Sequence, residues 1–138
     1  MHAPSKPSTD AVGGISNGPH RIKLILKVCC VAALVLLVFV GLGPANWQPR
    51  SGLGWEIDHF VGYFVLTLVF CLAWPRPRAV GGALIVFAVL LEILQALTPD
   101  RWSNLWAALY SALGAMAAAV IADLCIRARR RFRARGTT

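Results

Sequence analysis

Residues 79–98 read AVGGALIVFAVLLEILQALT, and this segment contains a single charged side chain, Glu92. An α-helix rises about 1.5 Å per residue, so a segment of this length matches the hydrocarbon core of a bilayer, which is about 30 Å thick. We therefore expect residues 79–98 to cross a membrane as a helix, with the carboxylate of Glu92 inside it.

Three further segments have the same apolar character: Leu24–Gly43, Ile57–Trp74 and Leu105–Ile126. Of the 138 residues, 57% are hydrophobic and 14% are charged, whereas soluble domains carry about 25% charged residues. Four such segments leave too little polar chain to cover them in water, and no room for a separate soluble domain. We predict an all-α fold, a four-helix transmembrane bundle over residues 24–126.

The two ends of the chain differ in composition. Residues 1–20 (MHAPSKPSTDAVGGISNGPH) are rich in Pro, Gly and Ser and lack an apolar period, so we predict a disordered tail over residues 1–23. Residues 127–138 form a basic tail. Leu24–Gly43 follows basic residues, as the apolar part of a signal peptide does, but it exceeds the usual length of about 7–15 residues. We expect it to remain as an anchor.

Positive charge is concentrated in alternate connections between the four segments, and these connections lie on one side of the membrane. Twelve of the 14 lysines and arginines lie before the first segment or at its start, between the second and third segments, or in the C-terminal tail; they are Lys6, Arg21, Lys23, Lys27, Arg76, Arg78, Arg127, Arg129, Arg130, Arg131, Arg133 and Arg135. Cytoplasmic loops carry the excess of Lys and Arg. We expect a multi-pass protein of the bacterial inner membrane with both termini in the cytoplasm.

The net charge of +8 raises the question of a partner for the basic tail. Because the tail follows a membrane-spanning segment, we expect it to lie on anionic lipid, which attracts each Lys or Arg by about 1 kcal/mol. We do not expect nucleic acid to bind there. Membrane lipid is therefore the first partner that the sequence predicts.

Most polar side chains outside the basic segments fall into one layer near the outer boundary. Asp58 and His59 open the second segment, Glu92 and Gln95 share a face near the end of the third, and Arg101 follows in the next turn. A carboxylate at membrane depth normally faces protein or water. We expect Glu92 to find a partner in His59 or Arg101. The alternative is that Glu92 and Gln95 only join helices by hydrogen bonds.

Further residues follow helical spacing. His59 and Tyr63 are four residues apart and share a face, and Gly62 beside them would admit a neighbouring helix. Asp123 can pair with Arg127 one turn later on the same helix. Small residues recur along the fourth segment and predict tight helix packing; they are Ala107, Ser111, Gly114, Ala115, Ala118 and Ala122.

The cysteines give no sign of a metal or redox site. Cys29, Cys30, Cys71 and Cys125 all lie inside the apolar segments, and none forms a C-x-x-C pair. Free cysteine inside a span behaves as a small apolar residue. We therefore expect no metal and no cofactor.

The polar residues, taken in order, resemble the VanZ-like family of small bacterial integral membrane proteins. The resemblance is carried over residues 55–118 by His59-Phe60-x-x-Tyr63, Glu92-x-x-Gln95, Pro99-x-Arg101 and Gly114. Trp55 and Glu56 stand where the family has Asp and Lys, and Ala107 and Ser111 stand where it has Asp and Asn. The family takes its name from a protein associated with teicoplanin resistance, so the resemblance implies a role at the cell envelope.

Three functions are compatible with these patterns. The first is a non-catalytic binding or accessory protein whose polar cluster engages an envelope lipid or a glycan group, lipid-linked or not; its ligand-binding residues would be Asp58, His59, Tyr63, Glu92, Gln95 and Arg101. The second is a membrane-embedded enzyme that acts on an envelope lipid or polysaccharide, with Glu92 or Asp58 as base and His59 as acid. The third is a structural subunit of a larger membrane complex. Because the family Asp is replaced by Ala107, we favour the first.

Overall fold

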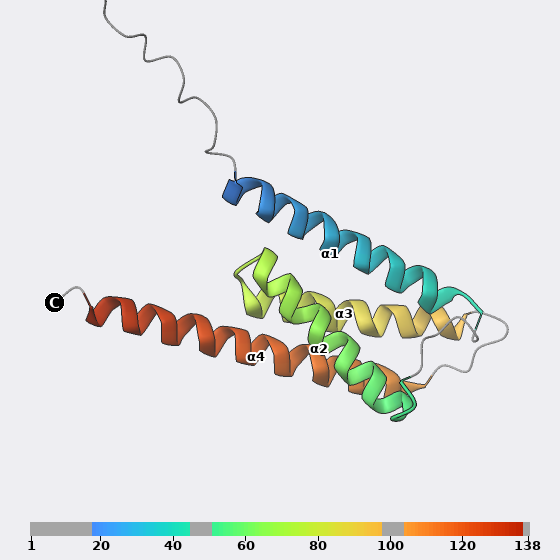
Figure 1. The fold of residues 1–138 in the computed structure, drawn as a ribbon. Coiled ribbons are helices and arrows are strands. Elements are labelled where there is room, and N and C mark those ends of the chain that lie inside the picture. Colours follow the sequence, from blue (N-terminus) through green and yellow to red (C-terminus); the bar gives the residue numbers. More distant parts are fainter. Residues whose placement is uncertain (1–17, 45–50, 98–103, 137–138) are drawn as a thin grey trace, which may run out of the picture.

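The computed structural model describes residues 18–44, 51–97 and 104–136. They form four α-helices and, within these ranges, no strand: α1 (Gly18–Leu42), α2 (Trp55–Ala73), α3 (Pro77–Ala96) and α4 (Leu105–Arg135) (Figure 1). Each helix is long enough and apolar enough to cross a membrane. The predicted all-α fold of four candidate membrane-spanning helices is confirmed.

Two helices extend beyond the boundaries that hydropathy predicts. Helix α1 begins at Gly18, so residues 18–23 are helical although we expected them to be disordered; residues 1–17 lie outside the described ranges. Helix α4 continues through the basic segment to Arg135 and has 31 residues. Alanine, leucine and arginine dominate it and it contains no proline, so local propensity favours one continuous helix. Hydropathy detects the end of an apolar segment, not the end of a helix.

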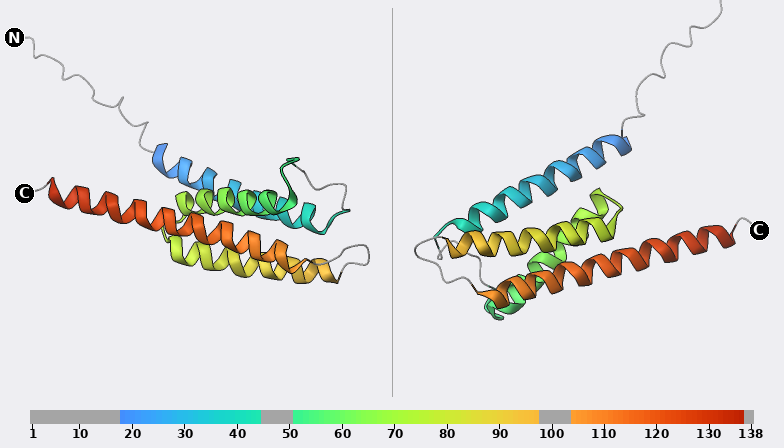
Figure 2. Two further views of the ribbon diagram at one scale, coloured as in Figure 1. Left: turned by 90° about the horizontal axis from the view of Figure 1, so that it is seen from below. Right: turned by 180° about the vertical axis from the view of Figure 1, so that it is seen from behind.

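The helices run antiparallel in chain order, which brings three segments to one end of the molecule. The start of α1, the turn between α2 and α3, and the end of α4 all lie at this end in both views (Figures 1 and 2). A short turn at Trp74–Arg76 reverses the chain, and Pro77 occupies the first helical position of α3. All lysines and arginines of the described residues lie toward this end, which we call the basic end.

Helix α4 packs against α2 and α3 through a stripe of small residues. Its buried residues are Ala107, Ala108, Ser111, Gly114, Ala115, Ala118 and Ala119. At Gly114 the backbone of α2 lies so close that a Cβ atom would collide with the carbonyl group of Phe60. The predicted packing role of α4 is confirmed, although Ala122 is only half-buried.

The expected close approach at Gly62 is wrong. A Cβ atom built on Gly62 would meet no atom within 4 Å, so this glycine borders open space. The sequence does not show which of the two glycines a neighbouring helix approaches, because Gly62 and Gly114 both lie within apolar helices. The close approach occurs at Gly114, where a glycine lies on the small-residue face of α4.

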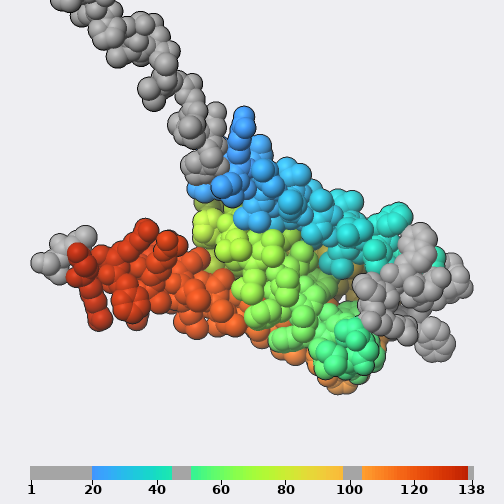
Figure 3. Space-filling model, viewed as in Figure 1, coloured from blue at the N-terminus to red at the C-terminus, as the bar shows by residue number. Residues whose placement is uncertain are grey.

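Helix α1 is the peripheral element of the bundle. It contacts α3 and lies along α2 (Figure 3), and many of its large apolar side chains are exposed, including Val28, Val35 and Phe39. Exposed apolar side chains on a membrane-spanning helix are those that contact lipid. Helix α1 therefore has one exposed apolar face, as expected for contact with lipid, and one face toward α2 and α3, where it leaves a cavity.

Candidate functional site

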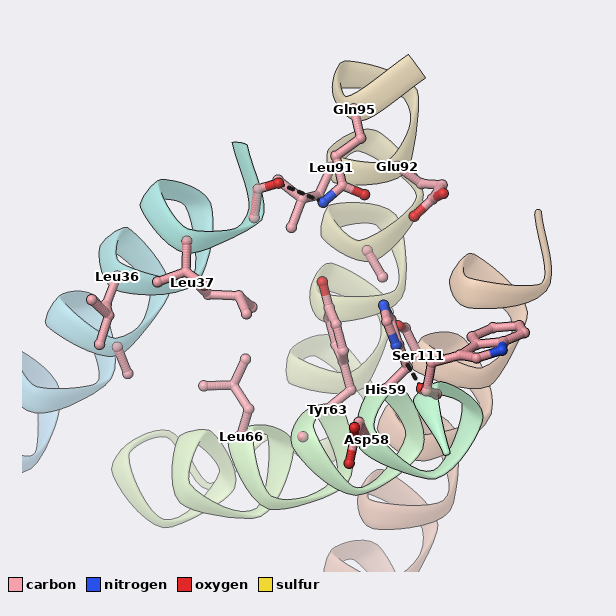
Figure 4. A pocket seen from close by; sticks show the side chains of 16 residues that line it. Leu36, Leu37, Asp58, His59, Tyr63, Leu66, Leu91, Glu92, Gln95 and Ser111 are labelled. Carbon is pink, nitrogen blue, oxygen red and sulfur yellow. Dashed lines mark hydrogen bonds between the residues drawn. The ribbon is translucent and has the colours of Figure 1, made fainter. Parts of the chain in front are cut away.

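A cavity of about 420 Å³ lies between α1, α2 and α3, away from the basic end. Helix α1 forms one wall, α2 and α3 form the others, and α4 adds Ser111 (Figure 4). Its lining residues are Ala33, Leu36, Leu37, Val40, Gly41, Trp55, Asp58, His59, Gly62, Tyr63, Leu66, Ala88, Leu91, Glu92, Gln95 and Ser111. We call it the polar-capped cavity, because polar side chains near the start of α2 and the end of α3 line it on the side of the loops, whereas Leu36 and Leu37 line it from the middle of α1.

Five of the six residues predicted from the sequence line this cavity: Asp58, His59, Tyr63, Glu92 and Gln95. The sixth, Arg101, lies outside the described residues. Helical spacing accounts for the grouping, since His59 and Tyr63 share one face of α2, and Glu92 and Gln95 share one face of α3. The two faces oppose each other across the cavity (Figure 4).

His59 is oriented by the first turn of its own helix. Its Nδ1 lies 2.8 Å from the carbonyl oxygen of Trp55, which can only accept, so Nδ1 carries a proton and donates it. In this tautomer Nε2 has the accepting lone pair, and this edge of the ring points into the cavity (Figure 4). The indole of Trp55 contacts the imidazole edge-on, with 6.1 Å between ring centroids. His59 thus presents one available nitrogen to the cavity.

Among the described residues, Glu92 is held by a backbone group and not by His59; Arg101, the other expected partner, lies outside the described residues. The Oε1 of Glu92 accepts a hydrogen bond from the N–H of Asn104, the residue before α4. Asn104 also caps α4, because its Oδ1 accepts from the N–H of Trp106 at 3.1 Å. No ion pair joins Glu92 to His59 within the described part of the chain. The free amide at the start of α4 satisfies the carboxylate instead, as amides at helix starts do for anions.

Gln95 fastens α3 to α1. Its Nε2 donates to the carbonyl oxygen of Gly41 at 2.7 Å, near the last turn of α1 (Figure 4). A Cβ atom on Gly41 would lie 3.2 Å from Leu91, so the two helices are closely apposed at this point. This hydrogen bond closes one end of the cavity.

Asp58 and Tyr63 complete the polar part of the lining. The Oδ2 of Asp58 accepts from the N–H of Ser51 at 3.2 Å, which holds the segment before α2 against that helix. Tyr63 is 6% exposed, and its hydroxyl points between α1 and α3 into the cavity (Figure 4). These two residues therefore differ: Asp58 makes a contact at the rim, whereas Tyr63 presents its hydroxyl to the interior.

The sequence reading missed the contribution of α1. Leu36, Leu37 and Val40 form the apolar wall, yet α1 is apolar on every side and its pattern marks no inward face. Trp55 and Gly62 were also not expected in the lining. An apolar wall beneath carboxylates, an imidazole, hydroxyls and an amide makes the cavity amphipathic.

The chemistry of the cavity is that of hydrogen bonding. Among the described residues there is no group of three or more His, Cys, Asp and Glu side chains that could hold a metal ion. The described lining also contains no lysine or arginine. A ligand at its polar end would meet hydrogen-bond acceptors from Asp58, His59 and Glu92, together with the hydroxyl of Tyr63.

Comparison of the chain with family models, with curated proteins and with solved structures finds no match. Membership of the VanZ-like family therefore stays a prediction from the quoted residues. The chain is a four-helix protein whose helices are each suited to crossing a membrane, with a polar-capped cavity beside its peripheral helix.

Proposed function

We propose that this is a VanZ-like protein of the bacterial cell envelope that binds an amphipathic envelope lipid, without catalysis, in the polar-capped cavity. The hydrocarbon part of the lipid would lie against Leu36, Leu37 and Leu66. The headgroup would lie among His59, Tyr63 and Glu92. The observation that carries the proposal is the division of one cavity into an apolar wall and a polar end.

The polar end favours a headgroup that donates hydrogen bonds. Its carboxylates, and the Nε2 of His59, are acceptors, and the described lining offers no lysine or arginine for a phosphate. Hydroxyl and amino groups are the matching donors. A lipid-linked sugar carries such groups, and Trp55 at the rim presents an aromatic ring beside them. The expected lipid-linked glycan is therefore the ligand class that fits best.

The distribution of charge supports an orientation with this cavity in the outer half of the inner membrane. The basic end lies opposite the polar end of the cavity, and cytoplasmic segments carry the excess of Lys and Arg. Both termini would then be cytoplasmic. Lipids that bear glycans are assembled and used at the envelope, which agrees with the role that the VanZ-like resemblance implies.

The experiment is to identify the lipid that remains with the protein. The full chain, extracted with its surrounding bilayer as native nanodiscs, would be compared by lipid mass spectrometry with the bulk membrane. We expect one hydroxyl- or amino-rich lipid to be enriched. Gly62→Leu should abolish the enrichment, because Gly62 borders open space and a leucine would fill the cavity. Gly82→Leu is the matched control, since Gly82 also borders open space but does not line the cavity.

Substitutions of Glu92 separate binding from helix joining. Glu92→Gln keeps an oxygen that can accept from Asn104, whereas Glu92→Leu removes the acceptor. If the carboxylate contacts the headgroup, both variants should lower retention of the lipid by about tenfold or more, since hydrogen bonds to charged groups contribute about 1.5–3 kcal/mol. Unchanged retention by Glu92→Gln, with loss only for Glu92→Leu, would assign Glu92 to holding α3 against α4 and not to ligand binding.

The orientation of His59 favours one alternative, a membrane-embedded enzyme. An imidazole that donates through Nδ1 and leaves Nε2 toward a cavity has the arrangement of a general base. Incubation of the purified protein with bacterial lipid extract distinguishes the two functions. Binding without catalysis predicts that the enriched lipid is recovered unchanged, and a new lipid product that disappears with His59→Gln would establish the enzyme.

A further inference from the structure

A second cavity, of about 430 Å³, lies at the basic end, between the α2–α3 turn and the part of α4 that runs from Asp123 to Arg130. Four arginines line it: Arg76 and Arg78 from the turn and the start of α3, and Arg127 and Arg130 from α4. The turn also contributes two prolines, which fix its backbone. We call it the arginine cavity.

The lining of the arginine cavity is strongly positive. Its one described carboxylate is Asp123, so four arginines against one aspartate leave three positive charges without compensation. Asp123 lies 2.6 Å from Arg127, which confirms the predicted pair, and 3.5 Å from Arg78 on α3. The carboxylate therefore orients one arginine from each helix. An anion in the cavity would relieve the repulsion among the remaining charges.

Arg76 and Arg130 are the groups available to such an anion. Within the described ranges neither forms a salt bridge with a carboxylate, and both line the cavity from opposite sides, one from the turn and one from α4. Guanidinium groups match phosphate through paired N–H donors. The arginine cavity therefore has the donors of a phosphate site, and the described lining of the polar-capped cavity contains no such arginine.

The depth of the arginine cavity favours a phosphate that belongs to a lipid. Trp74, at the end of α2, directly precedes the turn, and the Nζ of Lys27 lies 5.6 Å from the centre of its ring. Tryptophan and lysine gather at the level of the lipid headgroups. Basic pockets between helices at the cytoplasmic boundary are suited to anionic headgroups.

We propose that the arginine cavity binds the phosphate of an anionic phospholipid. Asp123 positions Arg78 and Arg127, and Arg76 and Arg130 contact the phosphate. This site differs from the loose attraction that we expected between the basic tail and anionic lipid, because it needs particular arginines from two elements. It is also independent of the ligand proposed for the polar-capped cavity.

The test measures lipid binding to the purified full chain in detergent by native mass spectrometry. The probes are phosphatidylglycerol and, with the same acyl chains, zwitterionic phosphatidylcholine. We expect phosphatidylglycerol to bind more tightly. Arg76→Gln combined with Arg130→Gln should weaken the binding of phosphatidylglycerol by about 30-fold, because the variant loses the attraction of two arginines to an anionic headgroup. Both residues are exposed, so the variant should fold, which circular dichroism verifies.

The matched control removes the same charge from α4 outside the cavity. Arg129→Gln combined with Arg133→Gln changes two exposed arginines that do not line it. We expect this double variant to weaken the binding of phosphatidylglycerol by less than about threefold, because salt screens charges that do not contact the bound lipid. Equal losses for the two double variants would overturn the proposal in favour of diffuse attraction. No loss for either variant, or equal binding of the two lipids, would also overturn it.

Two soluble probes identify the source of the phosphate. Glycerol 3-phosphate and inorganic phosphate offer the same chemistry without acyl chains. If either bound as tightly as phosphatidylglycerol and depended on Arg76 and Arg130, the ligand would be a soluble phosphate and not a lipid. Displacement of the lipid by a short oligonucleotide at equal concentration would assign the site to nucleic acid. The lipid proposal requires that none of the three competes at equal concentration.

Discussion

Glu92 brings a carboxylate into an apolar segment, and the protein satisfies it with the backbone of another helix. A charged side chain at membrane depth is costly unless it faces protein or water. Here the N–H of Asn104 donates to it, while one helical turn away Gln95 donates to the carbonyl of Gly41. Two neighbouring side chains of α3 thus join it to α4 on one side and to α1 on the other.

Gly114 gives a prediction at the same scale. A Cβ atom at Gly114 would collide with the Phe60 carbonyl, so Gly114→Ala should destabilise the protein by about 1–3 kcal/mol, as overpacking does. At Gly82 a Cβ would meet nothing, and Gly82→Ala should be neutral or stabilising by up to about 1 kcal/mol. Thermal unfolding in detergent, followed by circular dichroism, measures both. Equal stability of the two variants would contradict the close contact between α2 and α4.

Sequence spacing predicted which residues share the polar-capped cavity, but not what they contact. His59 with Tyr63, and Glu92 with Gln95, follow from helical periodicity and from similar depth in adjacent segments. The described partners of Glu92 and Gln95 are backbone groups. Every residue has a backbone carbonyl, and nearly every one a backbone N–H, so no residue type in the sequence points to these partners. We expected a side chain such as His59 to pair with Glu92. Among the described residues, the N–H of Asn104 donates to Glu92 instead.

At the scale of elements, hydropathy predicts the four helices but not which face of α1 is turned inward or where α4 ends. The pattern gave four spans in the correct order, because each one is a long apolar segment. It did not reveal that α1 forms a wall of the cavity, since α1 is apolar on all sides and no face stands out. It also did not reveal that α4 continues as a helix through its arginines, since helix propensity, not apolarity, decides that.

The hydrogen bond from Gln95 to Gly41 gives a prediction about how α1 is held against α3. Because Gln95 holds the end of α1 at Gly41, Gln95→Leu should loosen that end by about 0.6–1.7 kcal/mol, the range for side-chain hydrogen bonds between membrane helices. Hydrogen–deuterium exchange in nanodiscs should become faster near Gly41 and stay unchanged in α4. Ile93→Leu is the control, because Ile93 is exposed and should face lipid. Unchanged exchange near Gly41 would mean that apolar packing alone holds α1.

The whole molecule has two chemically opposite ends. The polar-capped cavity lies toward one end, with carboxylates and an imidazole, and the arginine cavity lies at the other. The antiparallel order of the helices produces this division, because every second connection reaches the same end. The sequence predicted the two layers from charge alone. It could not predict that each layer contains a cavity, since that depends on how far the helices stand apart.

This polarity makes the orientation in the membrane testable. In a variant whose four native cysteines are replaced by alanine, Ser51→Cys places a thiol beside the polar-capped cavity and Arg131→Cys places one on the basic end of α4. Both positions are exposed. Because positively charged segments stay in the cytoplasm, an impermeant thiol reagent applied to intact cells with a permeabilised outer membrane should label Ser51→Cys and spare Arg131→Cys.

Disruption of the inner membrane should expose Arg131→Cys and serves as the control. Labelling of Arg131→Cys alone in intact cells would reverse the orientation, and the cavity proposed for an envelope ligand would then open toward the cytoplasm.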